Sequence, residues 1–217
     1  EPRQASIPTV GRYYSKEWEK AYAEYDPKKA NTILDEMGLK WDKNREYRIM
    51  PNGKPLHLTV EVTAGFMAGW VDAMGLVKDY WKAIGVNSAI KSEERSLFQI
   101  RGKAGQFEVN VWRLDFVENF LKNPVKMVPI KQKYDFWAPL YGQWYQSKGK
   151  SGEEPTGDIR KLQELWDKIK VTADEKERDR LAREIVKLHT KNIWMIGTAG
   201  ELPTLMIAKN NLRNVPG

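Results

Sequence analysis

Residues that could carry out chemistry are few in this sequence and stand far apart. The chain of 217 residues contains no cysteine, which excludes disulfides, thiolate nucleophiles and cysteine-bound metals. Its two histidines, His57 and His189, are separated by most of the chain, and neither has a partner at metal-ligand spacing. We therefore interpret both histidines as ordinary surface or boundary residues rather than as catalysts.

The common sequence motifs of enzyme active sites are also missing. The sequence has no Gly-x-Ser-x-Gly nucleophile elbow and no phosphate-binding loop. Its 29 Asp and Glu residues leave a catalytic carboxylate pair open as an alternative, but no spacing singles one out. We expect no cofactor, no metal site and no enzymatic activity.

The tryptophans raise the question of carbohydrate binding. The chain has nine tryptophans, and flat rings stack on sugar faces with little loss of entropy. Trp70, Trp81 and Trp166 fall on apolar stripes at helical spacing, so they are predicted to be core residues. Three further aromatic residues lie in a less periodic region and are better placed to line a binding cleft: Trp137, Trp144 and Tyr145.

The net charge of +7 raises the question of a nucleic-acid partner. The basic residues are spread along the chain, and stretches such as residues 174–180 alternate them with acids. Alternating signs are typical of a solvated helix face, and a nucleic-acid interface needs a basic stripe. We therefore expect no nucleic-acid partner.

The elements that would position these residues follow a strand–helix–strand order. The run from Leu56 to Val62 alternates strictly between apolar and polar residues, which predicts a strand. Turn residues at 51–55 predict that this strand pairs with residues 47–50 in a hairpin. Further elements are predicted along the chain: helices at 27–37, 69–84 and 96–103, strands at 86–91 and 107–112, helices after residue 155 and from about residues 172–175, and a strand at 205–208.

This order favours an α/β fold with a mixed, mostly parallel sheet flanked by helices. In open α/β sheets, ligands bind beyond the carboxyl ends of the strands. The predicted strand at 107–112 ends at Trp112 and is followed by Arg113 and Asp115. We therefore predict that Trp112, Arg113 and Asp115 belong to a ligand-binding site.

Several segments, taken in order, resemble a known protein family. The first runs from Asp26-Pro27 through a helix to Gly38, and the second is the Pro-Asn-Gly-Lys-Pro-Leu run at 51–56. A long helix then leads into Ile-Gly-Val at 84–86, and two later segments lie at 144–155 and 210–216. Together they resemble the family 5 extracellular solute-binding proteins, which include oligopeptide-, dipeptide- and nickel-binding proteins. The resemblance covers the chain from about Tyr13 onward.

The resemblance implies a lobe of the type II periplasmic-binding-protein fold, within a longer protein of which this chain is a fragment. Residues 1–25 are then an incoming segment, residues 26–200 the α/β lobe, and residues 201–217 a strand returning toward a missing N-terminal lobe. The implied function is the substrate-binding component of an ABC importer, located in the periplasm or outside the cell. The implied partners are a small peptide or oligosaccharide, the membrane permease and the N-terminal lobe.

The resemblance also implies roles for two of the predicted site residues. In peptide-binding members, Trp112 and Asp115 would correspond to a tryptophan that faces the ligand and an aspartate that pairs with the peptide amino terminus. Three alternatives stay open. The first is that the chain belongs to an oligosaccharide- or opine-binding member of the same family, because the segments at 144–155 and 210–216 are similar to a subset that includes such binders. The other two are a non-catalytic domain that binds a protein and a hydrolase with an unrecognised carboxylate pair.

Overall fold

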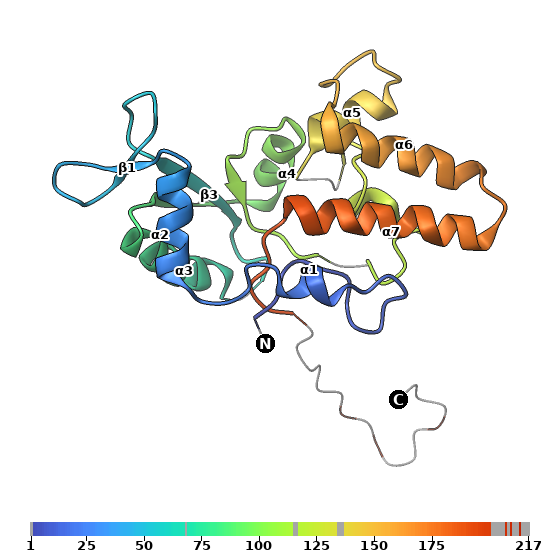
Figure 1. Ribbon diagram of the computed structural model, residues 1–217, viewed down its shortest axis with the longest axis horizontal. Coiled ribbons are helices and arrows are strands. Elements are labelled where there is room, and N and C mark those ends of the chain that lie inside the picture. Colours follow the sequence, from blue (N-terminus) through green and yellow to red (C-terminus); the bar gives the residue numbers. More distant parts are fainter. Residues whose placement is uncertain are drawn as a thin grey trace.

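The computed structural model describes residues 2–67, 69–114, 117–133 and 137–200, together with residues 207, 209 and 213. Figure 1 shows two groups of elements, which we call the sheet part and the helical part. Among the described residues, none of the helices is both long enough and apolar enough to cross a membrane. The predicted strand at 205–208 and the predicted return of residues 201–217 lie outside the described residues, except for the isolated positions 207, 209 and 213.

The elements of both parts have the following bounds. The sheet part contains β1 (Lys40–Trp41), β2 (Arg48–Ile49), β3 (His57–Thr63), β4 (Asn87–Glu93), β5 (Val109–Asn110), α2 (Pro27–Glu36), α3 (Trp70–Ala83) and α4 (Arg95–Lys103). The helical part contains α1 (Lys16–Lys20), the short 3-10 helix η1 (Pro124–Lys126), α5 (Pro139–Gln146), α6 (Gly157–Val171) and α7 (Glu175–Asn192).

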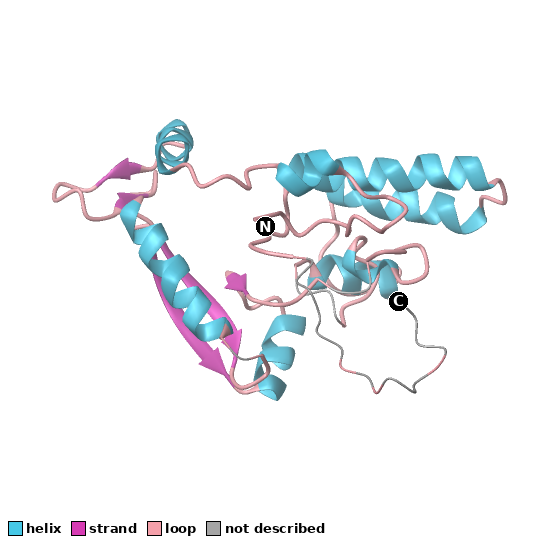
Figure 2. Cartoon of the chain, turned by 90° about the horizontal axis from the view of Figure 1, so that it is seen from below, coloured by secondary structure: helices cyan, strands magenta, loops and turns pink. Residues whose placement is uncertain are grey.

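The main sheet has three strands in the order β4-β3-β5, and both pairs of neighbours are parallel. Helix α3 connects β3 to β4, and α4 connects β4 to β5, so the predicted alternation of strands and helices is confirmed. The register pairs His57 with Asn87 and Thr63 with Glu93, so β3 and β4 end at the same edge. Figure 2 shows α3 lying along these two strands.

Two strand predictions differ in detail from the structure. Residues 47–50 contribute β2, whose ladder partner is β1 in an antiparallel pair, not residues 56–62. The predicted hairpin is reduced to a bridge between Ile49 and Pro55, because proline has no backbone N–H with which to extend a ladder. The strand predicted at 107–112 is shortened to β5, although the Val111 backbone N–H still donates to Glu61 O at 3.0 Å.

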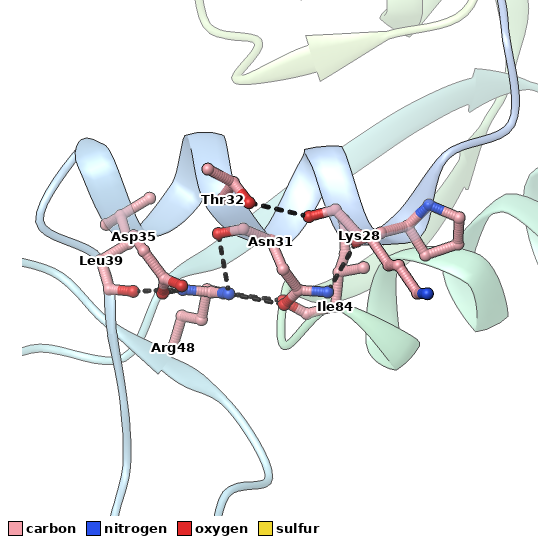
Figure 3. A network of polar contacts seen from close by, with 8 residues as sticks. Lys28, Asn31, Thr32, Asp35, Leu39, Arg48 and Ile84 are labelled. Carbon is pink, nitrogen blue, oxygen red and sulfur yellow. Dashed lines mark hydrogen bonds and ion pairs between the residues drawn. The ribbon is translucent and has the colours of Figure 1, made fainter.

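The fully buried Arg48 holds the outer end of the sheet part together (Figure 3). Its guanidinium donates to Asp35 Oδ1 at 2.7 Å and to Asn31 Oδ1 at 2.6 Å, both on α2. Arg48 Nε donates to Ile84 O at 2.8 Å, at the end of α3. The ring of Trp41 lies 4.8 Å from the guanidinium carbon. One side chain therefore fastens the β1–β2 hairpin to two helices.

The helical part contains the main apolar core. Helices α6 and α7 pack against each other, and residues predicted at their apolar stripes, such as Leu162, Leu181 and Ile185, are buried there. The predicted N-terminal signal of α7 is confirmed, since Asp174 Oδ1 accepts from Glu177 N at 2.7 Å. Helix α5 was not predicted, because its eight residues lack an apolar period.

The predicted incoming segment contributes to this core through Ile7, Tyr13 and Trp18. Its first residues run beside residues 197–199 (Figure 1), with a bridge between Pro2 and Ala199 and a 2.8 Å bond from Gly197 N to Gln4 Oε1. The two backbones approach closely, because a Cβ on Gly197 would lie 2.2 Å from Ala5 N.

Candidate ligand-binding site

The carboxyl ends of the three parallel strands meet at one edge of the sheet. Each strand is followed there by an aromatic or cationic side chain: Phe66 after β3, Arg95 after β4 and Trp112 after β5. The strand order puts β3 in the centre, so the segment that carries Phe66 lies between the other two. This is the edge at which ligands bind in open α/β sheets.

Five aromatic rings pack together at this edge, and we call them the aromatic stack: Phe66, Trp70, Phe98, Phe107 and Trp112. Phe66 lies parallel to Trp112 with a 4.9 Å centroid separation and a 5° angle. Trp112 also stacks on Phe98 at 5.5 Å, and Trp70 meets Trp112 edge-on at 6.0 Å. Phe98 is fully buried, whereas Phe66, Trp70 and Trp112 are half-buried. The stack therefore has a buried base and a partly exposed outer end.

Two arginines lie over the outer ring. The guanidinium carbon of Arg95 is 4.4 Å from the centroid of Phe66, and that of Arg113 is 5.8 Å away. Both side chains belong to exposed residues. The exposed end of the stack is therefore aromatic and positively charged, which suits a ligand with planar or apolar groups and an anionic group.

A buried ionic network lies between the sheet and α4. Arg101 donates to Glu61 Oε1 at 2.9 Å and also pairs with Glu93, which Lys91 contacts at 2.7 Å. Burial opposes ionisation of Glu93, but the hydrogen bonds from Lys91 and Arg101 outweigh it and hold its pKa below the usual value. The Arg101 guanidinium also lies 5.4 Å from the ring centroid of Phe107, so the network anchors the stack.

The structure brings together some of the predicted site residues. Trp112 and Arg113 both lie at the sheet edge, within or beside the aromatic stack. Asp115 lies outside the described residues. Among the described residues, no ring contact joins the other predicted aromatics to the stack.

Trp137 lies in the helical part, where its ring stacks on Trp194 at 5.3 Å. Both rings contact His189, and Trp18 stacks on the same imidazole at 5.1 Å. His189 is only 1% exposed, so its prediction as a surface or boundary residue was wrong. Burial lowers its pKa to about 4, although the hydrogen bond between Nε2 and Met127 O at 2.8 Å acts in the opposite direction.

Trp144 and Tyr145 line a separate pocket of about 420 Å³ between α5 and α6. The guanidinium of Arg160 lies 4.7 Å from the Trp144 ring centroid. Tyr145 Oη donates to Asp167 and accepts from Lys170 Nζ at 2.7 Å. Burial, followed by the bond to Asp167, raises the pKa of Tyr145 above its usual value.

The sequence analysis missed most of the aromatic stack. Trp70 and Trp81 were predicted to be core residues, but both are half-buried, and α3 has no fully buried residue among those described. Phe66, Phe98 and Arg95 were not singled out, although the positions of Phe66 and Arg95 a few residues after predicted strands were a usable signal. No group of three or more His, Asp or Glu residues suited to a metal ion occurs within the described ranges.

The comparisons with known proteins agree with this architecture. Residues 1–124 match the profile of the middle region of bacterial extracellular solute-binding proteins, family 5. A solved structure of an oligopeptide-binding protein, OppA, is 42% identical over 91% of this chain and 33% of its own length, with a TM-score of 0.82. No curated protein matches the chain.

More distant solved structures share the fold. One is MelB from Agrobacterium fabrum in complex with stachyose, with 20% identity, a TM-score of 0.70 and coverage of 91% of this chain and 29% of its own. Another is AppA from Bacillus subtilis in complex with a nonapeptide, with 16% identity, a TM-score of 0.62 and coverage of 88% and 35%. This chain therefore spans about a third of the length of these relatives. On the family match over more than half of its residues, the chain belongs to the bacterial extracellular solute-binding proteins, family 5.

Proposed function

We propose that this chain is one lobe of a two-lobed protein that captures oligopeptides and delivers them to the membrane permease of an ABC importer. The support is the 42% identity to an oligopeptide-binding protein, of which this chain covers 33%. We propose a location in the periplasm or outside the cell, in keeping with the family. Residues 26–200 would form the lobe, and the paired segments near residues 2–5 and 197–199 would connect it to the second lobe.

The observation that carries this proposal is the aromatic stack at the carboxyl edge of the parallel sheet. Phe66 and Trp112 present partly exposed rings there, beside the guanidinium of Arg113. A second lobe that closed over this edge would remove the rings and the ligand from water together, and binding would then favour the closed state. Asp115 would pair with the amino terminus of a peptide, as the family resemblance implies.

We keep three further residues as proposed ligand-binding residues: Trp137, Trp144 and Tyr145. They lie apart from the aromatic stack, so they would contact a different portion of the ligand. Trp137 packs among Trp194 and His189, and the other two line the pocket between α5 and α6. If the ligand occupies only the sheet edge, replacing Trp144 with Ala will leave affinity unchanged. A loss of affinity would extend the site to the helical part.

Oligosaccharide capture is a second candidate, favoured by the same stack. Aromatic rings form platforms for sugar faces, and two of the structural neighbours are described in complex with stachyose and mannohexaose. Their identities of 20% for the stachyose complex and 22% for the mannohexaose complex support the fold alone. Peptide binding is the leading proposal, because the neighbour with 42% identity is an oligopeptide-binding protein.

The test is a thermal-shift screen of the complete two-lobed protein against peptide and oligosaccharide libraries. A ligand at 100 times its Kd should stabilise the protein by about 2.7 kcal/mol, and the class that does so identifies the substrate. Trp112→Ala should weaken binding strongly. Trp41→Ala is the matched control, because Trp41 is also half-buried and stacks with an arginine, but lies on the β1–β2 hairpin, away from the carboxyl edge.

Two outcomes would contradict the proposal. One is a Trp112→Ala protein that binds normally but loses several kcal/mol of stability, which would make Trp112 purely a packing residue. The other is saturable turnover of a peptide or glycoside that one carboxylate substitution abolishes, which would identify an enzyme.

A further inference from the structure

The pocket between α5 and α6 lies in the helical part, and α6 supplies most of its lining. Its volume of about 420 Å³ is within the range of small-molecule sites in proteins, roughly 300–1,000 Å³. The lining residues of α6 recur at spacings of three and four, which places them on one side of the helix. They are Arg160, Gln163, Glu164, Asp167 and Lys170.

Contacts within the chain hold the aromatic wall of this pocket in place. The guanidinium carbon of Arg160 lies 4.7 Å from the ring centroid of Trp144. Tyr145 Oη accepts from Lys170 Nζ at 2.7 Å and donates to Asp167. Both hydrogen-bonding roles of the Tyr145 hydroxyl are therefore filled by the protein, and the wall is formed before any ligand arrives.

Gln163 is the buried polar residue of the pocket, with an exposed fraction of only 2%. Its Nε2 donates to Pro129 O at 2.8 Å and to Tyr141 O at 3.1 Å. Because both of these partners are carbonyl oxygens, the side-chain amide cannot be turned over, and Oε1 is fixed as an acceptor. Oε1 has no hydrogen-bond partner among the described residues. A buried carbonyl oxygen without a donor is uncommon, so this one indicates a donor that a ligand brings.

The charges that line the pocket leave one cation unpaired. Glu164 and Asp167 are each paired with a basic residue of α6. Lys148 also lines the pocket, is exposed, and forms no ion pair within the part of the chain that the structure describes. Three basic residues and two carboxylates give the lining a net charge of +1. A matching ligand therefore donates to Gln163 Oε1 and accepts from Lys148 Nζ.

We infer that this pocket binds a neutral polyhydroxyl compound, such as a single sugar ring. A hydroxyl group both donates and accepts, so neighbouring hydroxyls can serve Gln163 and Lys148 together. A carboxylate has no proton to donate to Gln163 Oε1. An ammonium group accepts nothing from Lys148 and is repelled by the positive lining. The inference goes beyond the proposed function, because it gives a ligand chemistry to a pocket other than the sheet edge.

Isothermal titration calorimetry on the complete two-lobed protein tests the pocket. The probes are the methyl glycosides of glucose, galactose and mannose, together with analogues in which an ammonium group replaces one hydroxyl. At least one neutral glycoside should bind, and its amino analogue should bind about tenfold more weakly. Added salt should leave the affinity of the neutral glycoside unchanged. No binding of any of the three, or equal binding of the amino analogue, would overturn the inference.

Lys148→Met should weaken binding of the glycoside about tenfold, because it removes the donor without changing the length of the side chain greatly. Lys150→Met is the matched control, since Lys150 is also exposed and lies on the same loop but is not among the residues that line the pocket. Equal affinities of the two variants would contradict the assignment. A loss of glycoside binding in Trp112→Ala, with Lys148→Met unaffected, would place the sugar at the sheet edge instead.

Gln163→Met removes the carbonyl oxygen but also two hydrogen bonds to the backbone, so its melting curve must accompany its affinity. A folded Gln163→Met protein that binds the glycoside normally would overturn the inference. If this variant does not fold, the comparison of Lys148→Met with Lys150→Met decides.

A trisaccharide of the sugar that binds separates the two sources of a sugar ring. Tighter binding of the trisaccharide indicates one unit of a longer solute, whereas equal or weaker binding indicates a free monosaccharide. If no glycoside binds, peptide capture stands. If no peptide or oligosaccharide stabilises the complete protein, the proposed function fails, whatever this pocket binds.

Discussion

The helical part and the sheet part of this chain are stabilised in different ways. In the helical part, α1, α6 and α7 bury a continuous apolar cluster that includes Phe120, Leu162 and Ile185. In the sheet part, α2 and α3 have no fully buried residue among those described, and polar contacts of Arg48 and Arg101 join the elements. The chain therefore combines an apolar core in the helical part with a sheet part whose carboxyl edge keeps aromatic and charged groups accessible.

The largest loss of stability should come from a substitution in the apolar core of the helical part. Phe120 is fully buried and meets the ring of Tyr13 edge-on at 5.2 Å. Phe120→Ala should lower the free energy of unfolding by about 3–5 kcal/mol, because it removes buried area and leaves a cavity. Urea unfolding followed by circular dichroism measures this. A loss below about 1 kcal/mol would mean that the core repacks around the cavity. It would contradict the view that apolar packing stabilises the helical part more than the sheet part.

Arg48→Met should cost about 3 kcal/mol in the sheet part, because it leaves the acceptors on Asn31, Leu39 and Ile84 without their donor. Hydrogen exchange should report earlier opening of α2 and the β1–β2 hairpin, with α6 and α7 unaffected. Arg45→Met, at an exposed position on the same hairpin, is the control. If both parts lose protection equally, they unfold as one unit and not as two differently stabilised regions.

Acid should destabilise the chain through His189. Its folded-state pKa of about 4 lies below the ordinary 6.5, so the unfolded chain binds a proton more readily. The contribution of neutral His189 to the free energy of unfolding is complete above pH 6.5. It falls by up to ~3 kcal/mol as the pH is lowered toward 4. Unfolding free energies of wild type and His189→Gln, measured from pH 7 to pH 4, should converge as the pH falls. Parallel curves would show that His189 does not titrate on unfolding.

The smallest effect should come from the outer surface of α3. Leu76 is 60% exposed, so Leu76→Ala should change stability by less than about 0.5 kcal/mol. Leu162→Ala removes the same atoms from the buried core. Thermal unfolding of the two variants therefore compares one chemical change at an exposed and at a buried position. Similar losses at both positions would show that α3 is more tightly packed than its exposure indicates.

Much of the fold could be predicted from the sequence because its signals are local. The apolar stripe of α6 and the cap at Asp174 predict helices without any knowledge of their partners. The position of Trp112 at the end of a predicted strand also predicted that it lies at the carboxyl edge of the sheet. The burial of His189 could not be predicted, because Trp18, Trp137 and Trp194 come from distant positions and meet only in the folded chain. For the same reason, Phe66 and Arg95 emerged as neighbours only once the strand order was known.

The pairing of the segment around Gln4 with the one around Gly197 has a mechanical consequence. Tension applied to the two segments in opposite directions would load their bridge at Pro2 and Ala199 first and separate the contacts one after another. These paired segments should separate at low force while the folded residues between them in the sequence stay intact. The same adjacency suits grafting, because a body whose two connections leave side by side can be inserted into a surface loop of another protein without stretching its host.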